Sequence, residues 1–302
     1  AGIDYTVGRL IPVVQSRARK KALLLVSIIS NLGVLGVFKY YNFFLSAVEG
    51  GLKIFGIEIP SLYLNLMLPV GISFYTFQSM CYTIDVYQQK IEPVKSILHF
   101  AAFTVFFPSL VAGPITKAQQ LIPQLQATPR LTSEMVSRGT FLIMKGLVKK
   151  LLFADFLAIN LVDRTFDNPQ AFTSVEMLMG LYGYTLQIYC DFSGYTDVAR
   201  GSAMLLGIEL PENFNRPYMA TSPAQFCRRW HMTLSSWLRN YVYFPLGGSR
   251  GSTARTYWNL WITFFLIGFW HGAGWTFVIY GVIHGTAMAI HRYFYKRAGR
   301  TK

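Results

Sequence analysis

The feature of this sequence that most restricts its fold is a stretch from Thr256 to His291 that contains no Asp, Glu, Lys or Arg. As one continuous helix, its 36 residues would extend roughly 54 Å, which exceeds the hydrocarbon core of a bilayer at about 30 Å. Gly272-Ala273-Gly274 interrupts the stretch directly after His271. We therefore predict two helical segments that meet within about four residues of this glycine joint.

The composition of the chain favours the lipid bilayer as its surroundings. Of its 302 residues, 52% are hydrophobic and only 14% are charged, against roughly 25% charged residues in an ordinary soluble domain. The formal net charge is +14, but Lys and Arg flank apolar runs, so we expect contact with lipid headgroups and no nucleic-acid partner. The three cysteines lack the spacing of a metal or redox site, which argues against a disulfide framework.

Hydropathy predicts an all-α, multi-pass integral membrane protein that forms one domain over residues 1–302, without a linker or an internal repeat. A basic cluster at residues 17–21 precedes the first apolar run and indicates that this run begins on the cytoplasmic side. Pro69 and Gly71 lie inside the second run and should kink or interrupt it. Besides the C-terminal stretch, the predicted spans are residues 22–38, about 62–82, 97–114, 141–162 and about 177–189.

Polar residues occur inside two of these runs, at a depth where such groups are expensive. Lys145, Lys149 and Lys150 recur at near-helical spacing, so we expect them to snorkel to the interface or to face a polar interior. The sequence CDFSGYTDVARG, residues 190–201, interrupts another run, and lipid exposure does not explain it. Residues 210–256 are rich in Pro, Asn and Arg, which favours amphipathic or re-entrant helices at the membrane face.

Three of the five histidines, His271, His284 and His291, lie in or at the end of the uncharged stretch. A histidine there is either a structural side chain that hydrogen-bonds a facing helix or a functional one. The glycine joint favours function for His271, because a neutral imidazole in an apolar cavity can take a proton from a hydroxyl nucleophile. The helical positions of the three residues do not suit a shared metal site, and no metal is expected.

A fourth histidine, His231, lies in RRWHMTLSSWLRNY, residues 228–241. Taken alone, this segment is typical of an amphipathic interfacial helix with Trp anchors, and His231 would be one of its polar residues. Arg228 and Arg229 could bind the phosphates of an acyl donor, or could equally contact anionic lipid headgroups.

Six sequence blocks in a fixed order resemble the bacterial membrane-bound O-acyltransferases, and most closely their alginate O-acetyltransferase branch. The resemblance covers nearly the whole chain, and teichoic acid D-alanyl transferases are more distantly similar. The blocks are LPVGISFYTFQSMCYTIDVY (68–87), FFPSLVAGPI (106–115), DFSGYTDVARG (191–201), PENFNRPY (211–218), RRWHMTLSSWLRNYVYFPLGG (228–248) and FWHGAGWTFVIYGVIHG (269–285).

This resemblance implies a helical fold around a central tunnel, in which an acyl donor and a hydroxyl acceptor approach from opposite sides of the bacterial inner membrane. It identifies His271 with the catalytic histidine of the family and His231 with its second characteristic histidine, whose role is proton abstraction, orientation or substrate contact. The expected substrate contacts are Trp270, Asn259, Ser235, Arg228, Arg229 and Asp191. Members of this branch have further helices at both ends, so we expect the chain to be an internal part of a longer protein.

The expected function is transfer of a short acyl group, acetyl by resemblance, from a cytoplasmic thioester to a hydroxyl of an exported polysaccharide such as alginate. The donor would be acetyl-CoA or an acyl carrier, no bound cofactor is expected, and periplasmic or extracellular accessory acyltransferases are expected partners. The alternative from another class is a polysaccharide or lipid transporter subunit, whose intramembrane polar residues line a path without chemistry. A purely structural membrane subunit is a third alternative, but a structural role would not explain the clustered polar motifs.

Overall fold

The computed structural model describes residues 1–60 and 62–299, and these residues contain helices and no β-strand. The helical class predicted from the sequence is therefore confirmed. The chain comprises two compact units, of which the first joins residues 1–104 to residues 215–302 and the second comprises residues 105–214.

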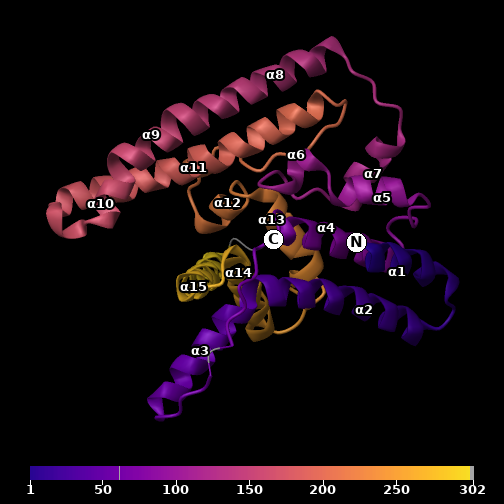
Figure 1. The fold of residues 1–302 in the computed structure, drawn as a ribbon, viewed down its shortest axis with the longest axis horizontal. Helices are drawn as coiled ribbons and strands as arrows, with labels where there is room; N and C mark the ends of the chain where they lie inside the picture. Colours follow the sequence, from indigo (N-terminus) through magenta and orange to yellow (C-terminus); the bar gives the residue numbers. More distant parts are fainter. Residues whose placement is uncertain (61, 300–302) are drawn as a thin grey trace. The chain divides into compact units, whose positions relative to one another are not determined.

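The first unit carries both histidine motifs (Figure 1). Its short π and 3-10 segments are η1 (Gly36–Tyr40), η5 (Pro217–Met219) and η6 (Arg239–Tyr243). Its α-helices are α1 (Gly2–Val13), α2 (Arg17–Leu35), α3 (Tyr41–Ile54), α4 (Ile72–Tyr87), α5 (Ile97–Thr104), α12 (Pro223–Cys227), α13 (Met232–Leu238), α14 (Thr253–His271) and α15 (Trp275–Arg297).

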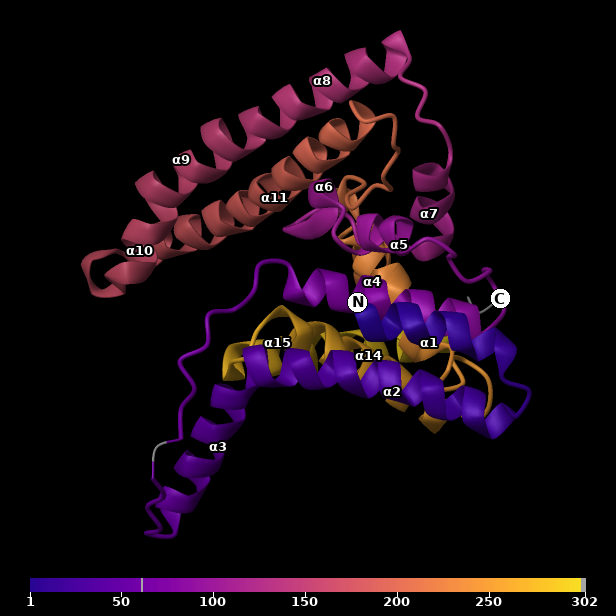
Figure 2. The same ribbon diagram turned by 45° about the vertical axis from the view of Figure 1, so that its right-hand side comes forward.

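Helices α2 and α3 follow one another through η1 and form a helical run of 38 residues, Arg17–Ile54. Within the described part of the chain, this is the one run that is long and apolar enough to cross a membrane by length and composition. Figure 2 shows α3 leaving the end of α2 at an angle. The bend coincides with the wider π-helical turn of η1, which is a common cause of helix bending.

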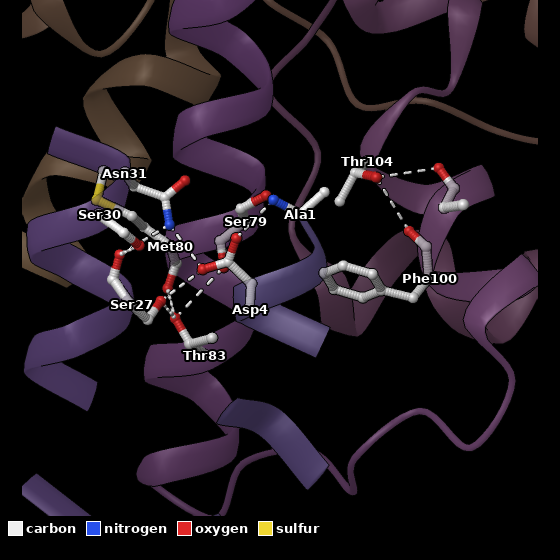
Figure 3. A network of polar contacts seen from close by, with 11 residues as sticks. Ala1, Asp4, Ser27, Ser30, Asn31, Ser79, Met80, Thr83, Phe100 and Thr104 are labelled. Carbon is white, nitrogen blue, oxygen red and sulfur yellow. Dashed lines mark hydrogen bonds and ion pairs between the residues drawn. The ribbon is translucent and has the colours of Figure 1, made fainter. Parts of the chain in front are cut away.

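A buried carboxylate connects the first helices of this unit (Figure 3). Asp4 of α1 is 1% exposed and accepts hydrogen bonds from Ser27 and Asn31 of α2, each at 2.6 Å. The Ser27 hydroxyl also lies 2.9 Å from that of Thr83 in α4. Because a buried charge without partners is strongly unfavourable, this network fixes how the three helices pack.

The uncharged C-terminal stretch is divided where we predicted. Helix α14 ends at His271, α15 begins at Trp275, and Gly272 and Gly274 between them have extended backbone. A Cβ on Gly272 would collide with the ring of Phe277, so the turn requires glycine for space. The two helices then pack closely, because a Cβ on Gly268 would lie 2.5 Å from the Cα of Gly281.

Two predicted spans are corrected by the structure. The run expected at about 62–82 becomes helical only at Ile72, after Gly71 adopts a left-handed conformation with φ of 74°. The run expected at 97–114 is also not one helix, since α5 ends at Thr104 and the next helix begins at Phe107. Pro108 at the start of that helix lacks an N–H group and cannot continue the ladder of the preceding turn.

The second unit is built on a long helical hairpin. Its elements are α6 (Phe107–Leu110), α7 (Ala118–Gln126), α8 (Ser133–Leu147), η2 (Val148–Ala154), α9 (Asp155–Leu157), η3 (Ala158–Val162), α10 (Asp163–Asp167), η4 (Pro169–Ala171) and α11 (Ser174–Met204). Figures 1 and 2 both show α11 alongside the run from α8 to α10. The CDFSGYTDVARG sequence therefore lies inside a continuous helix and does not break it.

Ion pairs account for the polar residues of this hairpin. Lys149 contacts the carboxylate of Asp197 at 2.7 Å and Lys145 contacts it at 3.1 Å. Lys150 lies 2.7 Å from Asp155 and 2.6 Å from Asp191. The lysines thus pair with carboxylates of the same hairpin.

Glycines let the backbones of α8 and α11 approach closely enough for these pairs. A Cβ on Gly146 would lie 2.6 Å from the carbonyl oxygen of Gly194, and a Cβ on Gly194 would lie 2.8 Å from that of Gly146. Gly139 and Gly201 repeat the arrangement one heptad away. Small residues at such positions are typical of helices that pack within a membrane.

We predict that Gly194→Ala lowers the thermal stability of the detergent-solubilised protein, because the backbone atoms opposite cannot move aside without separating the helices. Overpacking of this kind costs about 1 to 3 kcal/mol. The matched control is Gly33→Ala in α2, where no heavy atom lies within 4 Å of the added Cβ. Alanine is the better helix former there by about 1 kcal/mol, so the control should unfold at the same or a higher temperature. Equal unfolding temperatures for G194A and the unmodified protein would contradict this packing.

Candidate active site

The imidazole of His271 has a defined tautomer at the end of α14. Its Nδ1 lies 2.6 Å from the carbonyl oxygen of Ile267, one helical turn earlier. Because a carbonyl can only accept, Nδ1 carries the proton and donates it. In the neutral ring, Nε2 then holds a free lone pair, which is the arrangement required of a general base.

His231 lies beside it, in the turn that precedes α13. Its backbone is left-handed, with φ of 41° and ψ of 56°, which is uncommon for a residue other than glycine. Such conformations persist where the surrounding structure holds them. The ring is buried, at 3% exposed, and its centroid lies 6.5 Å from that of His271.

One pocket contains both rings. Its remaining lining is largely aromatic and aliphatic, with a few polar groups. The lining residues are Phe226, Cys227, Trp230, His231, Leu234, Ser235, Phe264, Ile267, His271, Tyr280 and His284. Its cavity volume is about 30 Å³, more than the roughly 10 to 15 Å³ that a cavity needs to hold one water molecule. The pocket therefore favours a small group next to the imidazoles.

The exposure of the two histidines differs. His271 remains accessible, whereas His231 is enclosed by protein. Burial, and secondarily the neighbouring His271, lowers the pKa of His231 to about 3. His231 is therefore neutral at physiological pH and is better suited to hydrogen bonding than to carrying charge.

A stack of three aromatic rings supports the site. Trp237 of α13 stacks on Phe77 of α4 at 3.9 Å, and Phe77 stacks in turn on Trp270 of α14 at 5.4 Å. The Trp237 indole also donates to the Phe77 carbonyl at 3.1 Å. The centroid of the Trp270 ring lies 6.0 Å from that of His231 and 5.2 Å from that of His271, so this expected substrate contact is beside both imidazoles.

Of the next two expected substrate contacts, one lines the pocket and the other does not. Ser235 lines the pocket, and its hydroxyl donates to the Cys227 carbonyl at 3.1 Å. Asn259 is buried but donates to the carbonyls of Leu246 and Gly248, at 3.2 Å and 3.0 Å, so its amide holds the turn after η6.

The remaining three are charged residues outside the pocket lining. The Nε of Arg228 donates to the Ala224 carbonyl at 3.2 Å, and an Arg229 nitrogen donates to the Arg216 carbonyl at 3.4 Å. Asp191 belongs to the second unit, where it pairs with Lys150. The ion pair gives Asp191 a structural role there.

Two groups of this site were not assigned to it from the sequence. The ring of Tyr280 lies 5.6 Å from that of His271 and 4.1 Å from that of His284. The Nδ1 of His284 donates to the Tyr280 carbonyl at 2.9 Å, so a third imidazole lines the pocket. Spacing alone could not indicate this, because α15 must first fold back on α14 at the glycine joint.

Comparison with known proteins points to the same family as the motifs. The chain is 42% identical over 269 residues to the probable alginate O-acetylase AlgI of Azotobacter vinelandii, covering 89% of this chain and 53% of that protein. It is 43% identical over 293 residues to its Pseudomonas aeruginosa counterpart, covering 96% and 55%. It is 37% identical over 317 residues to the peptidoglycan O-acetyltransferase of Helicobacter pylori, covering 96% and 59%.

The chain thus spans a little over half the length of these curated relatives. The sequence profile of MBOAT, the membrane-bound O-acyltransferase family, matches residues 93–301. That range includes His231, His271 and every residue of the pocket around them. The resemblance found in the motifs is confirmed, and the chain belongs to the membrane-bound O-acyltransferase family.

Proposed function

We propose that this chain forms the catalytic part of an O-acetyltransferase that modifies hydroxyls of an exported polysaccharide such as alginate. The observation that carries the proposal is the pair of imidazoles in one small pocket, with the Nε2 of His271 free to accept a proton. The pocket volume favours a short acyl group. Relatives named for O-acetylation of alginate and of peptidoglycan support a polysaccharide acceptor.

In the proposed mechanism, Nε2 of His271 removes the proton from the acceptor hydroxyl as its oxygen attacks the thioester carbonyl carbon. The carbonyl π electrons move to oxygen and form a tetrahedral oxyanion. When the carbonyl re-forms, the carbon–sulfur bond breaks, and the thiolate leaves with the electron pair and takes the proton from the His271 imidazolium. The indole N–H of Trp270, close to both imidazoles, is a candidate donor to the oxyanion.

The setting we propose is a multi-pass protein of the bacterial inner membrane. The basic start of α2 supports a cytoplasmic side for that end, and the acyl donor would be a cytoplasmic thioester, either acetyl-CoA or an acyl carrier. A tunnel would lead the donor and the acceptor to His271 from opposite sides. Accessory acyltransferase proteins beyond the membrane would complete transfer to the polysaccharide.

A transporter subunit is the alternative function, and the geometry of His271 favours chemistry over it. A residue that only lines a path needs no fixed tautomer, whereas a base must present a lone pair in a defined direction. Loss of the His271 imidazole should abolish activity in an acyltransferase but not in a transporter subunit, so a substitution at this position distinguishes the two functions.

We predict that His271→Ala in the full-length, membrane-inserted protein reduces acyl transfer by about 10² to 10⁴, the usual contribution of general-base assistance. His271→Gln should be equally inactive, because an amide accepts a hydrogen bond but takes up no proton at neutral pH. The measurement is transfer of labelled acetyl to exported polysaccharide in membranes that contain any required partners.

The matched control for this experiment is His291→Ala. His291 lies on the same helix as His284 but outside the pocket of His271, and its loss should leave most of the activity. Expression and elution in detergent should be unchanged in all three variants. Near-normal transfer by H271A would remove the catalytic assignment and favour the transporter.

For His231, we predict that Asn keeps more activity than Ala. A neutral, buried imidazole acts through contacts, and an Asn amide also offers a donor and an acceptor. Asn additionally tolerates the left-handed backbone that His231 adopts. Rates of acetyl transfer by H231N and H231A, compared at equal protein, test this. If both are as inactive as H271A, His231 takes part directly in proton transfer.

A further inference from the structure

A lysine of the membrane-spanning run lies next to the candidate active site. Lys39 belongs to η1, in the middle of the apolar run Arg17–Ile54, and is half-buried. No carboxylate lies within ion-pair distance of its ammonium in the part of the chain that the structure describes. An ionisable group at such a position is expensive to maintain, and this cost favours a functional role.

The contacts of Lys39 converge on the end of α14. Its Nζ donates to the main-chain carbonyl of Trp270, the residue immediately before His271. It also lies 3.3 Å from the hydroxyl of Ser73, at the start of α4. The ammonium is 5.5 Å from the centroid of the Trp270 ring, so one residue of α14 receives both its charge and its hydrogen bond.

The neighbouring side chain binds the preceding carbonyl. Tyr40 is 5% exposed, and its hydroxyl donates to the Phe269 carbonyl at 2.8 Å. Its ring stacks on that of Phe269, with centroids 4.4 Å apart and planes inclined by 12°. Lys39 and Tyr40, which are consecutive in η1, therefore donate to the carbonyls of two consecutive residues of α14.

These bonds satisfy a need that every helix end has. The carbonyls in the last turn of a helix have no amide donor further along it, and cations there also interact favourably with the helix dipole. Helix α14 ends at His271, and the backbone beyond it is extended. Without Lys39 and Tyr40 the last turn could fray, and His271 would lose the direction that its own bond to Ile267 gives it.

We infer that Lys39, assisted by Tyr40, is a positioning residue for His271 that fixes the end of α14 and thereby aims the imidazole. The inference rests on the proposed function, in which His271 is the base. It predicts an effect on the chemical step, since misplacing a base by about 1 Å can cost about 10²-fold in rate. Binding of the donor should be affected much less.

The test compares Lys39→Met with Lys39→Arg in the full-length protein in membranes, with acetyl-CoA as donor and kcat and KM measured separately. Met preserves much of the volume and removes the donor and the charge, so kcat should fall about tenfold or more, with KM for acetyl-CoA within about twofold. K39R should keep more activity than K39M because it retains a cationic donor. Tyr40→Phe removes one hydroxyl and keeps the ring stack, and should lower kcat by a few-fold.

Matched controls separate positioning from general effects on the helix. Lys53→Met removes an exposed lysine from α3, and Tyr41→Phe removes the hydroxyl adjacent to Tyr40. Both should leave kcat and KM unchanged. Should K39M not accumulate as folded protein, Y40F against Y41F decides the question alone.

Three results would overturn the inference. The first is an unchanged kcat in K39M or, where that variant does not fold, in Y40F. The second is a raised KM with an unchanged kcat, which would assign Lys39 to donor binding, and the third is an equal loss of kcat in K39M and K53M. Failure of the proposed function gives a different pattern. If the proposed function is wrong, H271A itself retains acyl transfer. If H271A is inactive and K39M is fully active, only the role of Lys39 is rejected.

Discussion

The end of one apolar helix determines the geometry of the candidate site. At the glycine joint, α14 ends at His271, and the Phe277 ring occupies the space that a side chain on Gly272 would need. Stopping leaves main-chain carbonyls without partners in apolar surroundings, where each must find a donor. The carbonyls of Phe269 and Trp270 receive donors from Tyr40 and Lys39 respectively. The residue that the proposed mechanism uses as its base, His271, therefore lies directly after two carbonyls that another helical segment holds.

The same rule, that polar groups in apolar surroundings must be paired, organises both units. In the first, Asp4 accepts from two side chains of α2. In the second, Asp197 binds two lysines of the facing helical run. Each arrangement requires close helix packing, which the glycines at positions 146 and 194 supply between α8 and α11. Polar residues inside apolar runs thus have a structural use in both units, and the proposed mechanism adds a chemical one for His271. The two uses differ in the geometry of the partners.

This distinction explains how much could be predicted from the sequence. The helical class and the break after His271 follow from hydropathy, length and glycine, all of which are local properties. The motifs identified His231 and His271 with the two characteristic histidines of one family, and the structure brings their rings into one pocket. Asp191 was expected to contact substrate, and its ion pair could not be predicted because its partner Lys150 lies on another helix. Lys39 was missed for the same reason, and the early end of α5 depends on Pro108 and the backbone around it.

The two imidazoles are close in space but not equivalent, and their environments indicate a division of labour. A base must exchange its proton with substrates and therefore needs access, which His271 has. His231 is enclosed and held in a strained backbone conformation, so its ring has few alternative positions. Two imidazolium ions at this separation would repel each other, so protonation of His271 in the proposed mechanism would favour a neutral His231. A fixed neutral neighbour can hydrogen-bond a substrate throughout the reaction, because its own charge need not change.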